Sequence, residues 1–138
     1  MSADVFSIIG SALNAQDMRM GAISSNLANA AAVAAPGQTP YRAHELVFQA
    51  APVEGGEGDT NMGVQVIATV QSNAPSQRRY DPGNPYADST GYVTGSNVST
   101  VDEMVNMIDS SNSYSASVAM LQQASRIDQQ IINSFQVT

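Results

Sequence analysis

Proline and glycine are unevenly distributed along this 138-residue chain, and their distribution limits the possible folds more than any other feature. All six prolines and eight of the ten glycines lie between residues 36 and 95. The two flanking segments therefore lack most of the residues that interrupt helices. We expect one long helix at each end of the chain and a differently built segment between them.

The N-terminal flank carries a helical repeat of apolar and small residues. Its members recur at alternating intervals of three and four, with one polar break: Phe6, Ile9, Leu13, Gln16, Met20, Ile23, Leu27 and Ala30. This spacing predicts an amphipathic helix with a heptad stripe. An alanine-rich run continues to Ala35 and ends at Pro36-Gly37, so we expect the helix to cover residues 4–35, roughly 45 Å.

The C-terminal flank repeats this pattern. It begins at Thr100-Val-Asp-Glu103, a predicted capping box in which the threonine hydroxyl and the glutamate satisfy free amide groups. The stripe that follows comprises Met104, Met107, Ser111, Tyr114, Val118, Leu121, Ser125, Asp128, Ile132 and Phe135. We expect a helix of about 35 residues, roughly 50 Å long. Because polar residues interrupt both stripes, the two helices alone bury only a thin seam, which predicts completion by neighbouring subunits.

Between the flanks, the pattern changes to strands and turns. Residues 64–70 alternate with a period of two, which predicts a strand, and residues 44–50 and 91–93 are weaker strand candidates. Residues 52–63 are rich in Gly, Glu and Asp, and we expect a mobile loop there. A tight turn in which glycine tolerates a positive φ is predicted at Tyr80, Asp81, Pro82, Gly83 and Pro85.

These patterns predict an α+β fold. Two long terminal amphipathic helices form a coiled-coil-like pair, and a small β-rich segment connects them. We expect the boundaries at residues 1–36, 37–99 and 100–138, all within one structural domain. The 43% hydrophobic content is sufficient for one modest core.

The composition argues against most kinds of chemistry. The chain has no cysteine, and His44 is its single histidine, so we expect no catalytic site, no metal site and no cofactor. Asp81 and Asp88 flank a turn without the spacing of a calcium loop, and aspartate in turns usually bonds its own backbone. The net charge of −7, with arginine as the only cationic side chain, disfavours nucleic acid as a partner. Arg78-Arg79 has two open interpretations, a grip on an acidic neighbour or a solvated face.

Membrane insertion is also disfavoured. No segment reaches the roughly 20 apolar residues of a membrane span, and residues 1–9 lack the basic region of a secretory signal peptide. From the residues alone, a cytoplasmic location and export by a dedicated apparatus both remain open.

Several segments resemble the flagellar rod and hook proteins, the axial family of the bacterial flagellum. The N-terminal part of the resemblance is residues 11–20 followed by Ser25-Asn-Leu-Ala-Asn29. Further segments resemble the proximal rod branch of that family: Pro40-Tyr-Arg42 with Val47-Phe48, residues 80–85 with Ala87-Asp88 and Gly91-Tyr-Val93, and Asn97-Val98 with residues 103–107. Together they extend over nearly the whole chain.

The resemblance implies a structural subunit of the basal-body rod, a hollow helical drive shaft in the periplasm that is exported without a cleavable signal. It implies that the two terminal helices form the subunit contacts, through Phe6, Ile9, Leu13, Met20, Ile23, Asn26, Leu27, Asn29, Met104, Met107, Tyr114, Val118, Leu121, Ile132 and Phe135. The implied partners are copies of the same chain, the rod proteins FlgB, FlgF and FlgG, the junction protein FliE, the MS ring and the type III export apparatus.

Two other classes of protein were weighed. A peptidoglycan hydrolase needs a catalytic carboxylate pair in a cleft, for which the chain has no candidate. A soluble helical export chaperone or adaptor also has two long amphipathic helices, but it has no need for the turn at residues 80–85 or for a β-rich middle. Incorporation into basal bodies, as opposed to a stable soluble heterodimer, distinguishes the rod subunit from the chaperone.

Overall fold

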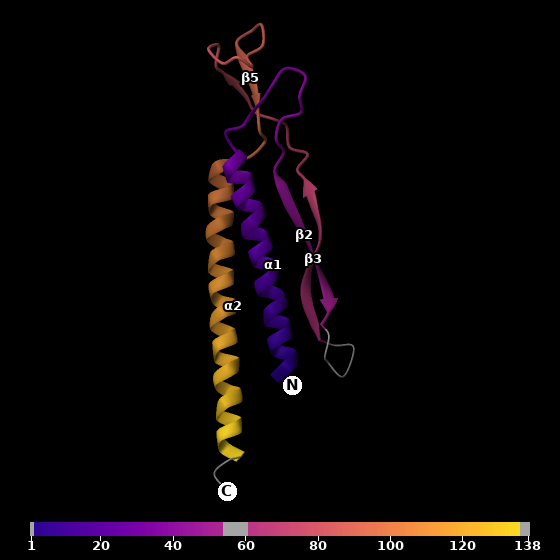
Figure 1. The fold of residues 1–138 in the computed structure, drawn as a ribbon, viewed down its shortest axis with the longest axis vertical. Coiled ribbons are helices and arrows are strands. Elements are labelled where there is room, and N and C mark those ends of the chain that lie inside the picture. The colour runs from indigo at the N-terminus through magenta and orange to yellow at the C-terminus, as the bar shows by residue number, and fades with distance from the viewer. Residues whose placement is uncertain (1, 54–60, 136–138) are drawn as a thin grey trace.

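The computed structural model describes residues 2–53 and 61–135 and confirms the predicted α+β class. The molecule is elongated, with two long helices side by side and a hairpin along one of them (Figure 1). The elements in chain order are α1 (Ser2–Asn29), β1 (Val33–Ala34), β2 (His44–Pro52), β3 (Met62–Gln71), β4 (Arg78–Tyr80), β5 (Tyr92–Gly95) and α2 (Thr100–Phe135). Most of the loop predicted at residues 52–63 lies outside the described residues.

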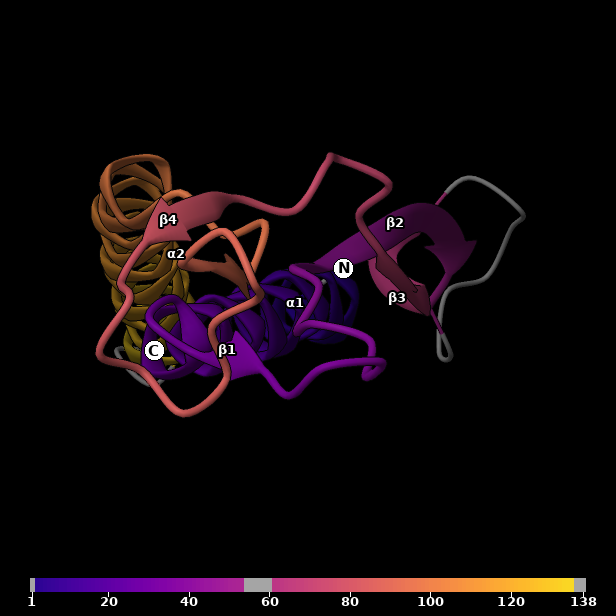
Figure 2. The same cartoon turned by 90° about the horizontal axis from the view of Figure 1, so that it is seen from above.

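Helix α1 is the central layer of the molecule. Helix α2 contacts it on one side and the β2–β3 hairpin contacts it elsewhere on its surface, as the two views show (Figures 1 and 2). Ile9, Ala15 and Ile23 are buried along this helix. Because α1 has partners on more than one side, it buries a wider face than the single heptad stripe that its sequence predicts.

Helix α1 ends at Asn29 and not at the predicted Ala35. The alanine-rich run turns instead, and Val33–Ala34 pairs with β5 as strand β1. Two carbonyl groups of this segment accept hydrogen bonds from Ser96. The Ser96 hydroxyl donates to the oxygen of Ala30 at 2.7 Å, and its N–H donates to the oxygen of Ala32 at 3.1 Å. These long-range hydrogen bonds outweigh the high helix propensity of alanine.

Helix α2 begins at the predicted Thr100, but its cap lies one residue earlier than predicted. Ser99 accepts hydrogen bonds from the N–H of Asp102 at its side chain and from the N–H of Glu103 at its carbonyl. Helices α1 and α2 have 28 and 36 residues, which correspond to about 42 Å and about 54 Å. The C-terminal part of α2 therefore extends past the start of α1 (Figure 1).

The face of α2 that packs on α1 differs from the predicted stripe. Its buried residues are Ser110 and Ser117, whereas Met104 is exposed although the stripe includes it. Small side chains at a helix contact allow the two backbones to approach closely, so packing selects serine here over the larger apolar residues nearby.

The strands form two separate antiparallel sheets. β2 and β3 pair from His44↔Gln71 to Pro52↔Met62, with an irregularity between Val47 and Phe48. Both strands were predicted, and both are longer than predicted. The second sheet, which we call the head sheet, has the strand order β1-β5-β4 and lies beyond the end of α1 and the start of α2 (Figure 1). β5 was predicted near residues 91–93, whereas β1 and β4 are too short to produce a periodic pattern.

The turn after β4 corrects the expectation for Gly83. The N–H of Asn84 donates to the oxygen of Asp81 at 3.1 Å, which closes a turn. Among the described glycines, Gly37 and Gly91 have positive φ angles, of 79° and 81°, and Gly83 does not. Gly91 is therefore the residue of this region that requires glycine.

Candidate subunit interface

A polar contact fixes how the two terminal helices align. Ser110 is fully buried, and its hydroxyl donates to Oε1 of Gln16 at 2.9 Å. Gln16, which interrupts the predicted stripe, thus has a polar partner on α2. Near it, Nη1 of Arg19 lies 3.2 Å from Oδ2 of Asp109, and because the Asp109 side chain is exposed, this ion pair adds little stability. The buried hydrogen bond sets the axial register of the helix pair.

Asn26 attaches the hairpin to α1. Its side chain is 1% exposed, and its amide pairs with the backbone of His44: Oδ1 accepts from the His44 N–H at 2.8 Å, and Nδ2 donates to the His44 oxygen at 3.0 Å. The Tyr41 hydroxyl also donates to Oδ1, at 3.1 Å. Both the oxygen and the nitrogen of this buried amide therefore have hydrogen-bond partners, as burial requires.

A second asparagine, Asn97, binds the backbone next to the open end of the hairpin, just before β2 and just after β3. Oδ1 of Asn97 accepts from the N–H of Ala43 at 2.7 Å, and its Nδ2 donates to the carbonyl oxygens of Ser72 and Ala74 at 3.1 and 3.0 Å. Asn26, Tyr41 and Asn97 come from three of the segments that carry the family resemblance. The structure brings these segments to one joint between the helices and the middle of the chain.

Asp88 organises the head sheet. Its Oδ1 accepts hydrogen bonds from the Thr90 hydroxyl at 2.6 Å and from the N–H groups of Thr90 and Tyr92 at 2.8 and 3.0 Å. Its Oδ2 lies 2.7 Å from Nη2 of Arg78. The hydrogen bond from the Thr90 hydroxyl, followed by that from Tyr92, lowers the pKa of Asp88 from 3.8 to about 2, with a smaller contribution from Arg78.

The two arginines before the turn bind acids of their own chain. Arg78 pairs with Asp88, and its guanidinium carbon lies 4.9 Å from the centre of the Tyr92 ring. Arg79 lies 3.6 Å from Asp81. The sequence left open whether Arg78-Arg79 grips an acidic neighbour or forms a solvated face. Both side chains are exposed, and each pairs with an aspartate of its own chain.

The structure shows His44 in a structural setting. Its ring lies 5.4 Å from that of Tyr41, and its backbone is held by Asn26. Within residues 2–53 and 61–135, no group of three or more histidine, aspartate and glutamate residues is arranged to hold a metal. In the same part of the chain, neither helix has the length and apolar character needed to cross a membrane.

The predicted interface residues lie in three different settings. Three are buried inside the folded chain: Ile9, Ile23 and Asn26. Others are half-buried: Phe6, Leu13, Met20, Leu27, Asn29, Met107, Tyr114, Val118 and Leu121. The exposed ones are Met104, Ile132 and Phe135. The last group is the most accessible of the three, with exposed fractions of 54% for Met104, 46% for Ile132 and 78% for Phe135.

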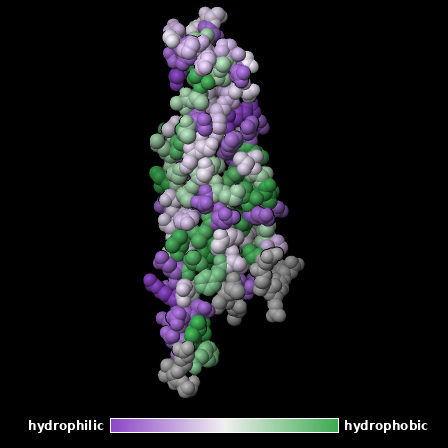
Figure 3. Space-filling view, in the orientation of Figure 1, coloured by the Kyte–Doolittle hydropathy of each residue, from purple (hydrophilic) through white to green (hydrophobic). Residues whose placement is uncertain are grey.

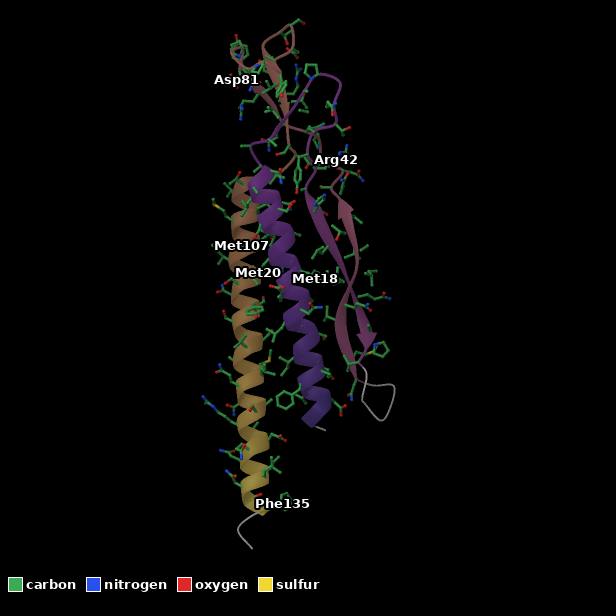
Figure 4. All side chains as sticks on the ribbon, viewed as in Figure 1. Met18, Met20, Arg42, Asp81, Met107 and Phe135 are labelled. Atoms are coloured by element: carbon green, nitrogen blue, oxygen red, sulfur yellow. The ribbon has the colours of Figure 1, made fainter. Side chains whose placement is uncertain are left out.

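Helix α2 exposes two apolar patches, most of whose residues the sequence stripe missed. The first patch consists of Val101, Met104, Val105 and Ile108. The second consists of Ile127, Ile131, Ile132 and Phe135, the last of which is 78% exposed at the end of α2 (Figure 4). Apolar residues also reach the surface along the helical part of the molecule in Figure 3. The patch residues outside the stripe are Val101, Val105, Ile108, Ile127 and Ile131. Within each patch they recur at intervals of three or four, which is a helical spacing that a single stripe does not include.

Comparison with known proteins defines the class first. The family model described as flagellar basal body rod FlgEFG protein C-terminal matches residues 89–134, which cover β5 and nearly all of α2. The chain thus shares its C-terminal part with flagellar basal-body rod proteins.

Full-length relatives identify the family within that class. The chain is 46% identical over 118 residues to the flagellar basal-body rod protein FlgC of Salmonella typhimurium, with 86% of each chain covered. It is 47% identical to FlgC of Escherichia coli O157:H7 with the same coverage, and 35% identical to FlgC of Agrobacterium fabrum over 84% of this chain and 82% of the relative. The chain belongs to the FlgC family of flagellar basal-body rod proteins, and the resemblance seen in the sequence is confirmed.

Proposed function

We propose that this rod protein polymerises through α1 and α2 into a hollow helical shaft that crosses the periplasm and transmits rotation. The observation that carries the proposal is the pair of apolar patches on α2, Val101 to Ile108 and Ile127 to Phe135. Exposed apolar clusters of this kind are typical of protein contacts, and a long helix gains stability when neighbours cover its free face.

The length difference between the helices supports the same proposal. Helix α2 continues beyond the start of α1, so the second patch has no cover from α1 (Figure 1). A neighbouring subunit that supplies the missing helix surface completes the packing there. In this arrangement the helices form the wall of the tube, and the hairpin and the head sheet lie outside it.

The proposed partners follow from the family. They are copies of this chain, the rod proteins FlgB, FlgF and FlgG, the junction protein FliE at the MS ring, and the type III apparatus that exports the unfolded chain. The function is mechanical, in keeping with relatives whose names describe rod proteins. The alternative of a soluble export chaperone gains no support from those relatives.

The test is to locate the protein in the cell. Basal bodies are purified from cells whose only copy of the gene encodes an epitope-tagged chain, and the tag is detected by blotting and by electron microscopy. We expect the tag in the rod, between the MS ring and the distal rod. Recovery only as a soluble complex with another protein would contradict the proposal and favour the chaperone.

A further inference from the structure

The arginines of this chain are almost all engaged within it. Arg19 pairs with Asp109, Arg78 with Asp88 and Arg79 with Asp81, and Arg42 donates to Asn73. Arg126 is different, because the described residues supply it with no hydrogen-bond or ion-pair partner. It is exposed on α2, beside a hollow that Phe6, Leu121, Gln122 and Ser125 also line.

Near the other end of α2, an acidic side chain has an oxygen without a hydrogen-bond donor. Oε2 of Glu103 is shielded from solvent and has no hydrogen-bond partner among the described residues. Glu103 lines a cavity of about 180 Å³ at the junction of α1, β2 and α2, together with His44, Glu45 and Asn106. The one arginine that lines this cavity, Arg19, is directed to Asp109. A shielded carboxylate oxygen without a donor is unfavourable, so a cationic donor that reached Oε2 of Glu103 would be stabilising there.

These two groups cannot meet within one molecule. Both belong to the same helix, which is continuous from Thr100 to Phe135. At about 1.5 Å per residue, Glu103 and Arg126 lie about 35 Å apart along the helix axis. An uninterrupted helix does not fold back on itself, so only a second molecule can bring Arg126 to the cavity.

We infer that Arg126 of one copy enters the Glu103 cavity of a second copy, which joins the two subunits head to tail. The inference rests on the proposed function and names a contact within it. A guanidinium carries five N–H donors, so one such group can donate to Glu103 and to Glu45, which line the same cavity. Because the two sides of the contact are different, each added copy presents a free Arg126 or a free Glu103 to the next, so the contact repeats in one direction.

Charge reversal tests the pair. We expect Glu103→Arg and Arg126→Glu, each as the only copy in the cell, to reduce the amount of protein in purified basal bodies about tenfold, because each places like charges together. The double variant Glu103→Arg with Arg126→Glu should restore most of the incorporation, which a simple folding defect would not. The control is Gln130→Glu, which adds a carboxylate at an exposed position one turn beyond Arg126 and should incorporate normally.

Cross-linking provides a second readout. Because the chain has no cysteine of its own, a thiol reagent reacts only with cysteines that are introduced. Asn106 lines the Glu103 cavity and Gln122 lines the hollow beside Arg126. A chain with both Asn106→Cys and Gln122→Cys should form a ladder of cross-linked oligomers in basal bodies under a short bis-maleimide reagent, whereas either substitution alone should form none.

The outcomes separate this inference from the proposed function. If the wild-type chain is absent from basal bodies, the proposed function fails. If the wild-type chain and Arg126→Glu incorporate equally and no ladder forms, the rod subunit stands and the inference is overturned. Loss with Glu103→Arg but not with Arg126→Glu also overturns it, because the cation would then come from a different protein.

Discussion

Ser110 on α2 donates its hydroxyl hydrogen to Oε1 of Gln16 on α1 at 2.9 Å, at a point where Ser110 has no exposed surface. The two residues are distant in sequence, and each is unusual for a helix seam. Together they form a buried polar contact between the two helices. A seam of leucine alone would allow the helices to slide by a turn, whereas a buried polar pair has a partner in only one register.

We predict that Ser110→Val destabilises the subunit by about 1–3 kcal/mol, because the added methyl group overpacks a filled site and Gln16 loses its donor. The matched control is Ser111→Val at the adjacent exposed position, which should change stability by less than about 0.5 kcal/mol. Urea unfolding followed by circular dichroism measures both. Equal effects of the two substitutions would contradict the proposed role of this contact.

Asn26→Leu should release the hairpin from α1. The substitution leaves the N–H and the carbonyl of His44 without the partners they now have, and each unsatisfied buried group costs about 1–3 kcal/mol. Hydrogen exchange at the His44 amide is expected to accelerate in the variant. Asn29→Ala serves as the control, since among the described residues the Asn29 side chain bonds only the Ser25 carbonyl, one turn earlier. Unchanged protection of the His44 amide in Asn26→Leu would show that the joint is held by other contacts.

Gly91→Ala should destabilise the head sheet, whereas Gly83→Ala should not. Gly91 has a φ of 81°, and a Cβ there would lie 2.8 Å from Cε2 of Tyr80. The conformation alone costs about 1–2 kcal/mol for alanine. Nothing lies within 4 Å of a Cβ at Gly83, so that alanine is tolerated. Proteolysis within residues 78–95 is the measurement, and greater sensitivity of the Gly83 variant would contradict the assignment.

The stability of the head sheet should depend on pH through Asp88. Its folded pKa, about 2, lies below the ordinary 3.8, so the folded state binds the proton less readily than the unfolded state. The stabilising contribution is therefore present above about pH 4 and is lost as the pH falls from about 4 to about 2. An NMR titration of the Thr90 and Tyr92 amides should show this transition. It should be absent in Asp88→Asn, and a midpoint near 4 in the wild type would contradict the depressed pKa.

Ile132→Asp should prevent rod assembly without unfolding the subunit. Ile132 is 46% exposed in the second patch, so a carboxylate there stays hydrated in the free subunit and becomes buried only in the polymer. We expect loss of swimming in soft agar with normal protein levels and normal helical content. Gln123→Asp, at an exposed position outside the two patches, is the control and should swim. Normal swimming by Ile132→Asp would show that this patch is not an assembly contact.

The local sequence determined the elements whose causes are local. The absence of proline and glycine after residue 95 and the heptad spacing predict α2 with its first residue at Thr100, and the alternation in residues 64–70 predicts β3. The resemblance in the terminal helices and in Asn97-Val98 also led to the right family. These features depend on backbone propensity and periodicity, which a short window of sequence contains.

Tertiary structure decided the features that depend on distant partners. The alanine run after Asn29 has high helix propensity, but it forms a turn and strand β1. The reason is that Ser96, at the other end of the middle segment, donates hydrogen bonds to the carbonyl groups of Ala30 and Ala32. Ser110 and Ser117 line the helix contact, and the apolar patches of α2 face outward, because close approach to α1 favours small side chains. Propensity acts within a few residues, whereas burial and hydrogen bonding between segments far apart in the chain exist only after the chain has folded.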